Sequence, residues 1–314
     1  MIYIFFSALF FILILVYFLI ADKFNIIDHP NERSSHSKIT IRGGGIIFLV
    51  AIIISGILEQ QYLIPMIGAS IIGIISFVDD RITLSSKIRI LFHLVAVTLM
   101  FYFLSVFGIL PWWGVLMLYI LVIGVINAYN FMDGINGITG LYSVVILGGL
   151  QYVNLYQTSF VAPDVIWLPM ISCLVFLYFN FRKKAKCFAG DVGSVTMAFW
   201  IIMLLLQLIV KTNNYSYILF LSVYGVDAVL TIIHRLMLKQ NIFEAHRLHF
   251  YQILANDQKI PHLIVSSIYG VVQLLIIGLV VLGGVNFYVL GLTILIPLIL
   301  VYLILKPKLM LKAA

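Results

Sequence analysis

Residues 193–210 have the sequence GSVTMAFWIIMLLLQLIV, a run of 18 residues without a charged side chain. The run is apolar on every side, too long for a β-strand, and close to the roughly 20 residues that a helix needs to cross a bilayer. Within lipid, a helix satisfies every backbone polar group inside its own segment. The run therefore predicts a transmembrane helix.

Similar apolar runs fill most of the remaining chain. They span residues 2–20, 44–58, 62–78, 90–108, 111–127, 138–154, 165–180, 215–233, 263–282 and 286–305. The alternating apolar and polar pattern of a membrane β-barrel is missing. We therefore expect an all-α polytopic transmembrane bundle of about 11 spans (10–11), formed by residues 1–314 as a single integral-membrane domain.

The composition supports the same fold class. Of the 314 residues, 63% are apolar and 10% are charged, whereas a soluble chain averages roughly 45–50% and about 25%. This excludes a water-soluble enzyme, a disordered protein and a disulfide-rich secreted scaffold. The 19 Lys and Arg outnumber the 12 Asp and Glu. No separate soluble domain contains the excess, so we expect no nucleic-acid partner.

The charged residues predict an orientation and an active face. With eleven spans, 18 of the 19 Lys and Arg fall on one side, and only Lys211 falls on the other. Cytoplasmic loops are enriched in Lys and Arg, so we expect the N-terminus outside and the C-terminus in the cytoplasm. Ten of the 12 acidic residues also fall on the cytoplasmic side or at that end of a span. Because ionisable groups at such positions suggest function, we expect the chemistry at the cytoplasmic face.

Two cytoplasmic segments are rich in carboxylates and amides. Asp79 and Asp80 follow the run 62–78, and adjacent carboxylates repel one another unless a cation or a proton lies between them. An ordinary charged helix end is the alternative. The loop 127–137, NAYNFMDGING, has no Lys or Arg. Its asparagines and aspartate supply oxygen ligands and amide donors, which favours a polar-headgroup or nucleotide site over a plain turn.

Asp191 lies between Gly190 and Gly193 at the start of the run 193–210. A carboxylate there can bind Mg²⁺, and glycines at a helix N-terminus admit phosphate oxygens. Phe188 is the only aromatic residue of the loop before it. Phe188 can stack on a base, or it can simply anchor the membrane interface.

Two more segments contain donors suited to phosphate. The loop 241–252 concentrates two histidines and an arginine, and the loop 28–45 combines Arg, Ser and Thr with a glycine run. Zinc is disfavoured in the former because no cysteine is near and the histidine spacing is wrong. Asp227 lies in an otherwise apolar span; a functional group and a polar partner for a neighbouring helix are equally good interpretations. One soluble phosphorylated or nucleotide compound and one lipid phosphate are the expected substrates.

Taken in order, the cytoplasmic loops resemble the polyprenyl-phosphate N-acetylhexosamine-1-phosphate transferases, the family that includes phospho-MurNAc-pentapeptide translocase. The matching pieces are Pro30-Asn31-x-Arg33-Ser34-x-His36 with Arg42-x-Gly44-Gly45, Asp79-Asp80-Arg81 with Leu84-Ser85 and Lys87, Asn127-Ala128-x-Asn130-x-x-Asp133-Gly134, Phe188-x-Gly190-Asp191-x-Gly193-Ser194, and Arg247-x-His249. The family transfers a sugar 1-phosphate from a UDP-N-acetylhexosamine to a polyprenyl phosphate, usually undecaprenyl phosphate, and releases UMP.

The resemblance implies roles for individual residues. Asp191 matches the ligand of Mg²⁺, for which Mn²⁺ is a substitute, and the implied catalytic residues are Asp79, Asp80 and Asp133. The implied substrate-binding residues are Asn31, Arg33, His36, Arg42, Lys87, Asn127, Asn130, Asn136, Asn180, Phe188, Arg247 and His249. The resemblance also implies a bacterial inner-membrane location among membrane lipids, with the active face cytoplasmic, and it allows a homodimer.

Two departures from the family pattern bear on the substrate. Many members have aspartate where this chain has Asn136, and the translocase's consecutive histidines are replaced by His246-Arg247-Leu248-His249. The second departure argues against a pentapeptide substrate and resembles the branch that starts O-antigen or other surface glycans. The sugar itself stays open. A secondary transporter or lipid flippase with a cytoplasmic-face anion site is the alternative, although transporters place their ionisable groups near the midplane and show two related halves.

Overall fold

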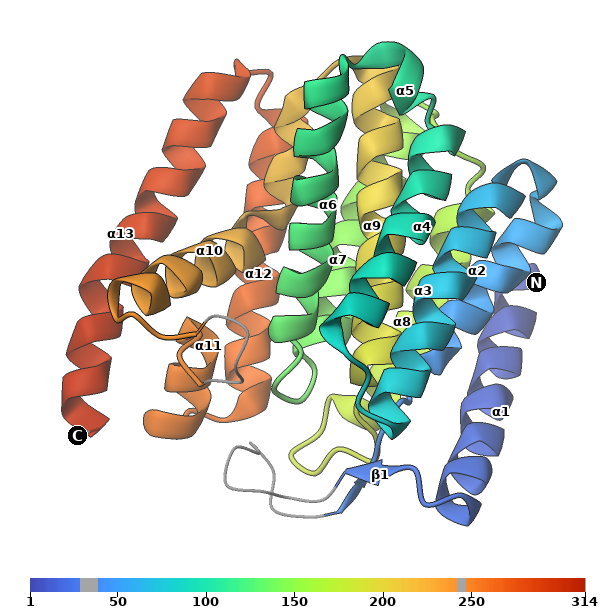
Figure 1. Cartoon of the computed structure of the whole chain (residues 1–314), viewed down its shortest axis with the longest axis horizontal. Helices are drawn as coiled ribbons and strands as arrows, with labels where there is room; N and C mark the ends of the chain where they lie inside the picture. Colours follow the sequence, from blue (N-terminus) through green and yellow to red (C-terminus); the bar gives the residue numbers. More distant parts are fainter. Residues whose placement is uncertain (29–38, 242–246, 314) are drawn as a thin grey trace.

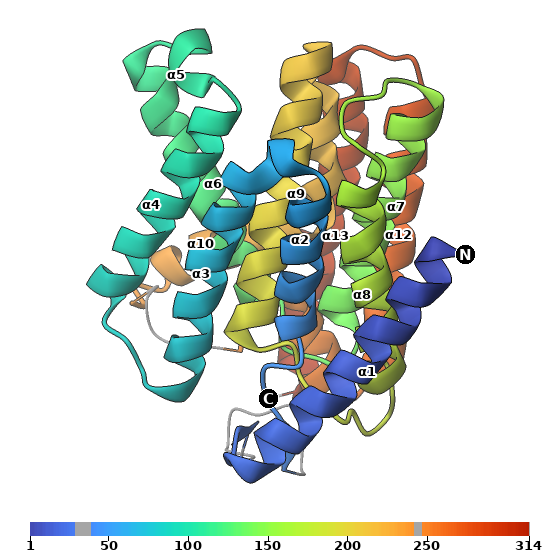
Figure 2. The same cartoon turned by 90° about the vertical axis from the view of Figure 1, so that its right-hand side faces the viewer.

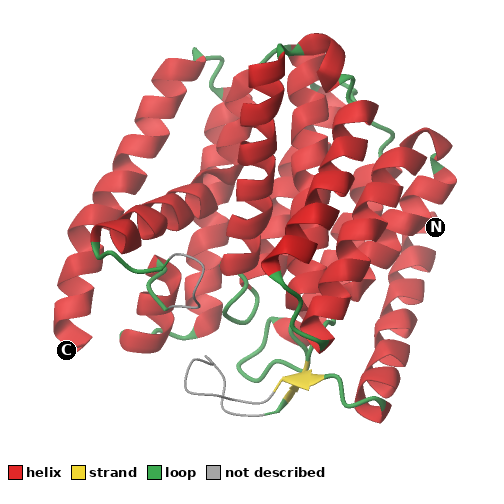
Figure 3. Cartoon of the chain, viewed as in Figure 1, coloured by secondary structure: helices red, strands yellow, loops and turns green. Residues whose placement is uncertain are grey.

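The computed structural model describes residues 1–28, 39–241 and 247–313. Helices dominate these ranges (Figures 1 and 3). The longer helices are α1 (Ile2–Lys23), α2 (Ile46–Leu58), α3 (Leu63–Arg81), α4 (Ser86–Phe103), α6 (Trp112–Phe131), α7 (Ile138–Tyr156), α8 (Asp164–Asn180), α9 (Gly190–Thr212), α10 (Ser222–Met237), α12 (His262–Leu282) and α13 (Phe287–Ala313). The short ones are η1 (Gln60–Tyr62), α5 (Val106–Ile109), η2 (Tyr215–Leu221), α11 (Phe250–Gln252) and η3 (Ile253–Asp257).

Every predicted apolar run coincides with a helix, which confirms an all-α polytopic membrane bundle. Nine of the described helical segments are long and apolar enough to cross a bilayer, whereas Ile46–Leu58 and Asp164–Asn180 are shorter. The count of eleven spans and their orientation therefore stay predictions. The run 90–108 differs in one detail: the helix breaks at Ser105, which adopts a left-handed conformation with φ 56° before α5 begins.

Helix α9 forms the centre of the bundle. Within its most apolar 18-residue window, 89% of the residues are buried, more than in any other described span. It packs on α2, α3, α6 and α7. Trp200, the largest fully buried side chain, donates its Nε1–H to the carbonyl of Val165 at 3.0 Å. The start of α9 touches the start of α2 so closely that a Cβ on Gly45 would overlap the backbone of Gly193.

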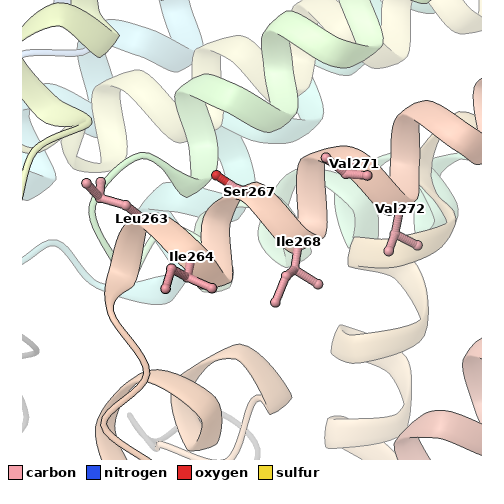
Figure 4. A pocket seen from close by; sticks show the side chains of 6 residues that line it. All are labelled: Leu263, Ile264, Ser267, Ile268, Val271 and Val272. Carbon is pink, nitrogen blue, oxygen red and sulfur yellow. The ribbon is translucent and has the colours of Figure 1, made fainter.

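The remaining helices lie around this centre. α1 packs obliquely against α8 (Figure 2), and α13 packs against α10 at the opposite edge (Figure 1). A shallow pocket on the outer face of α12 is lined by Leu263, Ile264, Ser267, Ile268, Val271 and Val272 (Figure 4). Five of these six side chains are aliphatic, as expected for a helix face that meets lipid tails.

One small sheet lies at the end of the bundle where α3 ends and α9 begins. β1 (Ile27–Asp28) pairs antiparallel with β2 (Thr40–Ile41), and Ile27 lies opposite Ile41. Ile41 also forms a parallel bridge with Cys187. The sheet thereby joins the segment before α2 to the loop before α9, and this junction positions the site described next.

Candidate active site

The backbone around β2 fixes a guanidinium beside the start of α9. The N–H of Gly44 donates to the carbonyl of Phe188 at 2.8 Å, and the N–H of Gly45 donates to the carbonyl of Ala189 at 3.1 Å. The Tyr17 hydroxyl donates to the carbonyl of Arg42 at 2.6 Å. These bonds hold Arg42 between the loop before α9 and the end of α3.

Arg42 joins two of the predicted site carboxylates. Its Nη2 lies 2.7 Å from Oδ1 of Asp80 and 3.9 Å from Oδ1 of Asp191. Burial alone would lower the pKa of Arg42, but the two carboxylates raise it above its ordinary value. The Asp80 side chain is 1% exposed and that of Asp191 is 25% exposed, so Asp191 is the carboxylate that solvent reaches.

Gly190 allows the close approach of α3 and α9. Its φ is +71°, and a Cβ there would lie 2.6 Å from Oδ2 of Asp80. The same Asp80 oxygen accepts the backbone N–H of Val192 at 3.3 Å. A glycine at this position is therefore required both by the backbone conformation and by the neighbouring carboxylate.

Asp79 faces a different environment from Asp80. Its Oδ1 accepts the N–H of Leu84 at 2.7 Å, and its Oδ2 lies 3.2 Å from Nη1 of Arg89. These contacts close the turn between α3 and α4. The two adjacent carboxylates therefore do not share one cation in this structure, because each has its own arginine.

The loop 132–137 supplies the other side of the site. Ser194 at the start of α9 donates its hydroxyl to Oδ1 of Asn130 at 2.9 Å. Asp133 accepts the hydroxyl of Thr139 at 2.5 Å. Burial, followed by the negative charge of Asp191, raises the pKa of Asp133 to about 7 although the Thr139 bond and Arg42 oppose the rise.

The charges of the site suit one divalent cation. Asp191 acts electrostatically on Asp79, Asp80 and Asp133. The guanidiniums of Arg42 and Arg89 form ion pairs with Asp80 and Asp79. No group of three or more His, Cys, Asp and Glu able to hold a metal occurs in the described part of the chain. Mg²⁺ is commonly held by one or two carboxylates with substrate phosphates and water. Asp191, with Asp80 beside it, could supply such carboxylates, and magnesium binding stays a prediction.

Several predicted substrate-binding asparagines bind the protein backbone. Asn180 is buried; its Oδ1 accepts the N–H of Gly137 at 2.6 Å, and its Nδ2 donates to the carbonyl of Cys187 at 2.8 Å. Asn136 is also buried and donates to the carbonyl of Arg182 at 2.8 Å. Asn127 donates to the carbonyl one turn earlier in α6, at 2.8 Å. These bonds assemble the loops, and a substrate contact at these positions stays a prediction.

The other predicted binding residues lie at different depths. Lys87 is exposed on the first turn of α4, whereas Phe188 and Arg247 are half-buried. Asn31, Arg33 and His36 lie outside the described residues. His249 is 2% exposed, so its predicted contact with substrate is not available on the surface of this structure.

The structure adds two residues that the sequence did not single out for the site, and it gives a contact to a third that the motif at the start of α9 contains. Arg89 and Thr139 contact Asp79 and Asp133, and Ser194 of the motif contacts Asn130. Thr139 lies in the first turn of α7, directly after the predicted loop 127–137, and this closeness in sequence could have suggested it. The contact of Ser194 with Asn130 joins segments 64 residues apart, so helical spacing could not have predicted it.

The chain is similar to known proteins over this region. The profile of glycosyl transferase family 4 matches residues 62–209. A probable undecaprenyl-phosphate N-acetylglucosaminyl 1-phosphate transferase of Bacillus subtilis is 29% identical over 255 residues, covering 75% of this chain and 71% of that protein. An undecaprenyl-phosphate alpha-N-acetylglucosaminyl 1-phosphate transferase of Escherichia coli is 28% identical over 264 residues, with 75% of this chain and 70% of that protein covered. A phospho-N-acetylmuramoyl-pentapeptide-transferase of Thermotoga neapolitana is 26% identical over 252 residues, with 74% and 82% covered.

Proposed function

We propose that this multi-pass membrane protein is a member of glycosyl transferase family 4 and transfers an N-acetylhexosamine 1-phosphate from a UDP-sugar to undecaprenyl phosphate, since residues 62–209 match that family and a relative is named for this kind of transfer. UMP is released, and the product starts a lipid-linked surface glycan. The observation that supports this most strongly is the cluster of Arg42, Asp80 and Asp191 where α3 meets α9. Asp80 and Asp191 lie within the residues that match the family, and Arg42 contacts both of them.

The proposed reaction is a direct phosphoryl transfer. An oxygen of the lipid phosphate attacks the β-phosphorus of the UDP-sugar, and the bond from that phosphorus to the bridging oxygen breaks as UMP leaves with the electron pair. Such transfers depend on positioning and charge neutralisation more than on covalent help from the protein. An aspartyl-phosphate intermediate is the alternative route, and the arrangement of Asp80 against Arg42 favours the direct one because that carboxylate is already paired.

The residues of the site have distinct proposed tasks. Asp191 is the exposed carboxylate that would hold Mg²⁺, with Asp80 beside it. The bound ion would neutralise charge on the diphosphate. Arg42 keeps the two carboxylates together before substrate arrives, and its remaining N–H groups suit phosphate oxygens. Asp79 and Asp80 place the acceptor phosphate or keep it deprotonated. The loop 132–137, called the Asp133 loop below, faces the nucleotide sugar.

The charge pattern supports a proposed location. We propose a bacterial inner membrane with the site on the cytoplasmic face, supported by the 18 of 19 Lys and Arg that fall on that side of the eleven predicted spans. A cytoplasmic face gives the site access to a soluble nucleotide sugar and to a lipid phosphate at the bilayer surface.

The test is UMP release by the purified protein with undecaprenyl phosphate, Mg²⁺ and a panel of UDP-N-acetylhexosamines. We expect release with at least one donor, and a loss of at least about 100-fold in Asp191→Asn, since removing one charge-stabilising group typically costs that much. Asp164→Asn is the matched control, because Asp164 starts α8 and contacts Tyr3 away from the site.

Two results would contradict the proposal. Near-normal activity of Asp191→Asn would remove the metal assignment. No UMP release with any donor would favour the transporter or flippase, which a flux measurement in proteoliposomes would then detect.

A further inference from the structure

Asp227 in α10 is a buried carboxylate that the reaction above does not use. It is 3% exposed. Its Oδ1 accepts the backbone N–H of Phe250 at 2.8 Å, and its Oδ2 accepts the N–H of Tyr251 at 3.2 Å. The Tyr269 hydroxyl of α12 donates to Oδ2 at 2.7 Å. One side chain therefore joins α10 and α12 to the first turn of α11.

The same carboxylate also faces His249. Nδ1 of His249 lies 3.5 Å from Oδ1 of Asp227. The His249 side chain accepts from the backbone of Gln252, and the Gln252 side chain accepts from the N–H of His249, so the turn 249–252 is a capping box. Asp227 thus fixes a compact turn from outside while the capping box closes it from within.

This turn lies directly against the Asp133 loop. The Tyr251 hydroxyl donates to the carbonyl of Phe131 at 2.9 Å. The rings of His249 and Phe131 have centroids 6.3 Å apart, and a Cβ on Gly134 would overlap the Tyr251 hydroxyl. Phe131 and Gly134 flank Asp133, so the position of Tyr251 determines where the loop can lie.

Direct substrate binding by Asp227 does not fit its surroundings. The cavity beside it has a volume of about 110 Å³ and is lined mainly by aliphatic and aromatic side chains, whereas ligand pockets typically measure about 300–1,000 Å³. The carboxylate already accepts two backbone N–H groups and the hydroxyls of Tyr269 and Thr231. Its partners are parts of the fold.

We propose that Asp227 is a positioning residue for the Asp133 loop. It fixes the turn 249–252, and the Tyr251 hydroxyl of this turn donates a hydrogen bond to the carbonyl of Phe131. The proposal rests on the proposed function in one respect, the assignment of the Asp133 loop to the nucleotide sugar. Its structural content, a mechanical connection from α10 to residues 131–134, can be tested without any activity.

The first test is hydrogen exchange of the purified protein, measured on peptides that cover 247–254 and 131–137. In Asp227→Asn, the amide in place of the carboxylate loses the charge-assisted bonds to the two N–H groups, and we expect faster exchange in both peptides. Tyr302→Phe is the control. The Tyr302 hydroxyl lies 2.7 Å from the Thr231 hydroxyl, which donates to Oδ1 of Asp227 at 3.3 Å. This variant therefore changes the side-chain surroundings of Asp227 and leaves its bonds to the two backbone N–H groups in place.

The second test is kinetic and uses the transferase assay. We expect kcat/KM for the UDP-sugar to fall by about 100-fold in Asp227→Asn, the loss typical of a misplaced reacting group, while KM for undecaprenyl phosphate stays unchanged. Partial unfolding would instead lower kcat and leave both KM values unchanged. Tyr251→Phe should reproduce the loss, and the double variant should add little to it, because both residues act through one connection.

The outcomes distinguish failure of the positioning role of Asp227 from failure of the proposed transferase function. Faster exchange confined to 247–254, or additive losses in the double variant, would overturn the positioning role. Should Asp227→Asn fail to fold, Tyr251→Phe tests the same connection, since it removes only the bond to Phe131 and must speed exchange in 131–137. A wild-type protein without UMP release would contradict the proposed function alone and leave the exchange result to decide this proposal.

Discussion

Replacing Gly190 by alanine tests the site at its tightest point. A left-handed conformation costs a non-glycine residue roughly 1–2 kcal/mol, and Gly190 has φ +71°. The new Cβ would also lie 2.6 Å from Oδ2 of Asp80 and 3.0 Å from the backbone of Gly43. Overpacking of this kind typically costs about 1–3 kcal/mol. The expected loss of unfolding free energy is therefore about 2–5 kcal/mol.

The loss should appear in function as well as in stability. Asp80 cannot withdraw freely, because Arg42 at 2.7 Å and the N–H of Val192 at 3.3 Å hold it. Displacing it separates Asp80 from Arg42 and from the start of α9. We expect UMP release to fall by at least about 10-fold in the folded fraction, since misplacement of about 1 Å can cost 100-fold.

The assay is unfolding in mixed detergent and SDS micelles, followed by tryptophan fluorescence, with UMP release measured on the same samples. Gly148→Ala in α7 is the matched control, because a Cβ there meets nothing within 4 Å; it should be neutral or stabilising by up to about 1 kcal/mol. If Gly190→Ala matched the wild type in both measurements, the close contact between α3 and α9 would be wrong.

Two further predictions concern the loops. Burial raises the pKa of Asp133 to about 7, so between about pH 4 and pH 7 the folded state keeps a proton that the unfolded state has released. Relative to Asp133→Asn, the melting temperature of the wild type without Mg²⁺ should therefore fall as the pH rises from about 4 to about 7. Parallel pH profiles for the two proteins would refute the burial. Asn180→Ala leaves the N–H of Gly137 and the carbonyl of Cys187 without their partner. The free energy of unfolding should fall by about 2–6 kcal/mol, at about 1–3 kcal/mol for each group. An unchanged SDS unfolding midpoint would show that the bonds are dispensable.

The helices could be predicted from the sequence, because a long apolar run within lipid can satisfy its backbone hydrogen bonds as a helix. The sequence did not predict the break at Ser105, since no proline or glycine marks it and the left-handed turn depends on packing. The predicted span 215–233 also begins as the 3-10 helix η2 (Tyr215–Leu221), which an apolar run does not distinguish from an α-helix.

The gathering of carboxylates at one end was predictable, but their pairing was not. Neighbours on a helix point about 100° apart, so Asp79 and Asp80 face different arginines. Which arginine each one meets depends on contacts between distant segments. The same holds for Asn180 and Asn136, whose amides suit a ligand as well as a backbone carbonyl; only the folded loops show that they bind the backbone.

The burial of α9 has a consequence for motion during turnover. A helix enclosed on nearly all sides exchanges its amide protons only when much of the bundle opens, and Asp191 belongs to its first turn. We therefore expect Asp191 to keep its place during turnover, and we expect the displacements that admit the proposed substrates to occur in the loops around α9 and not in α9 itself.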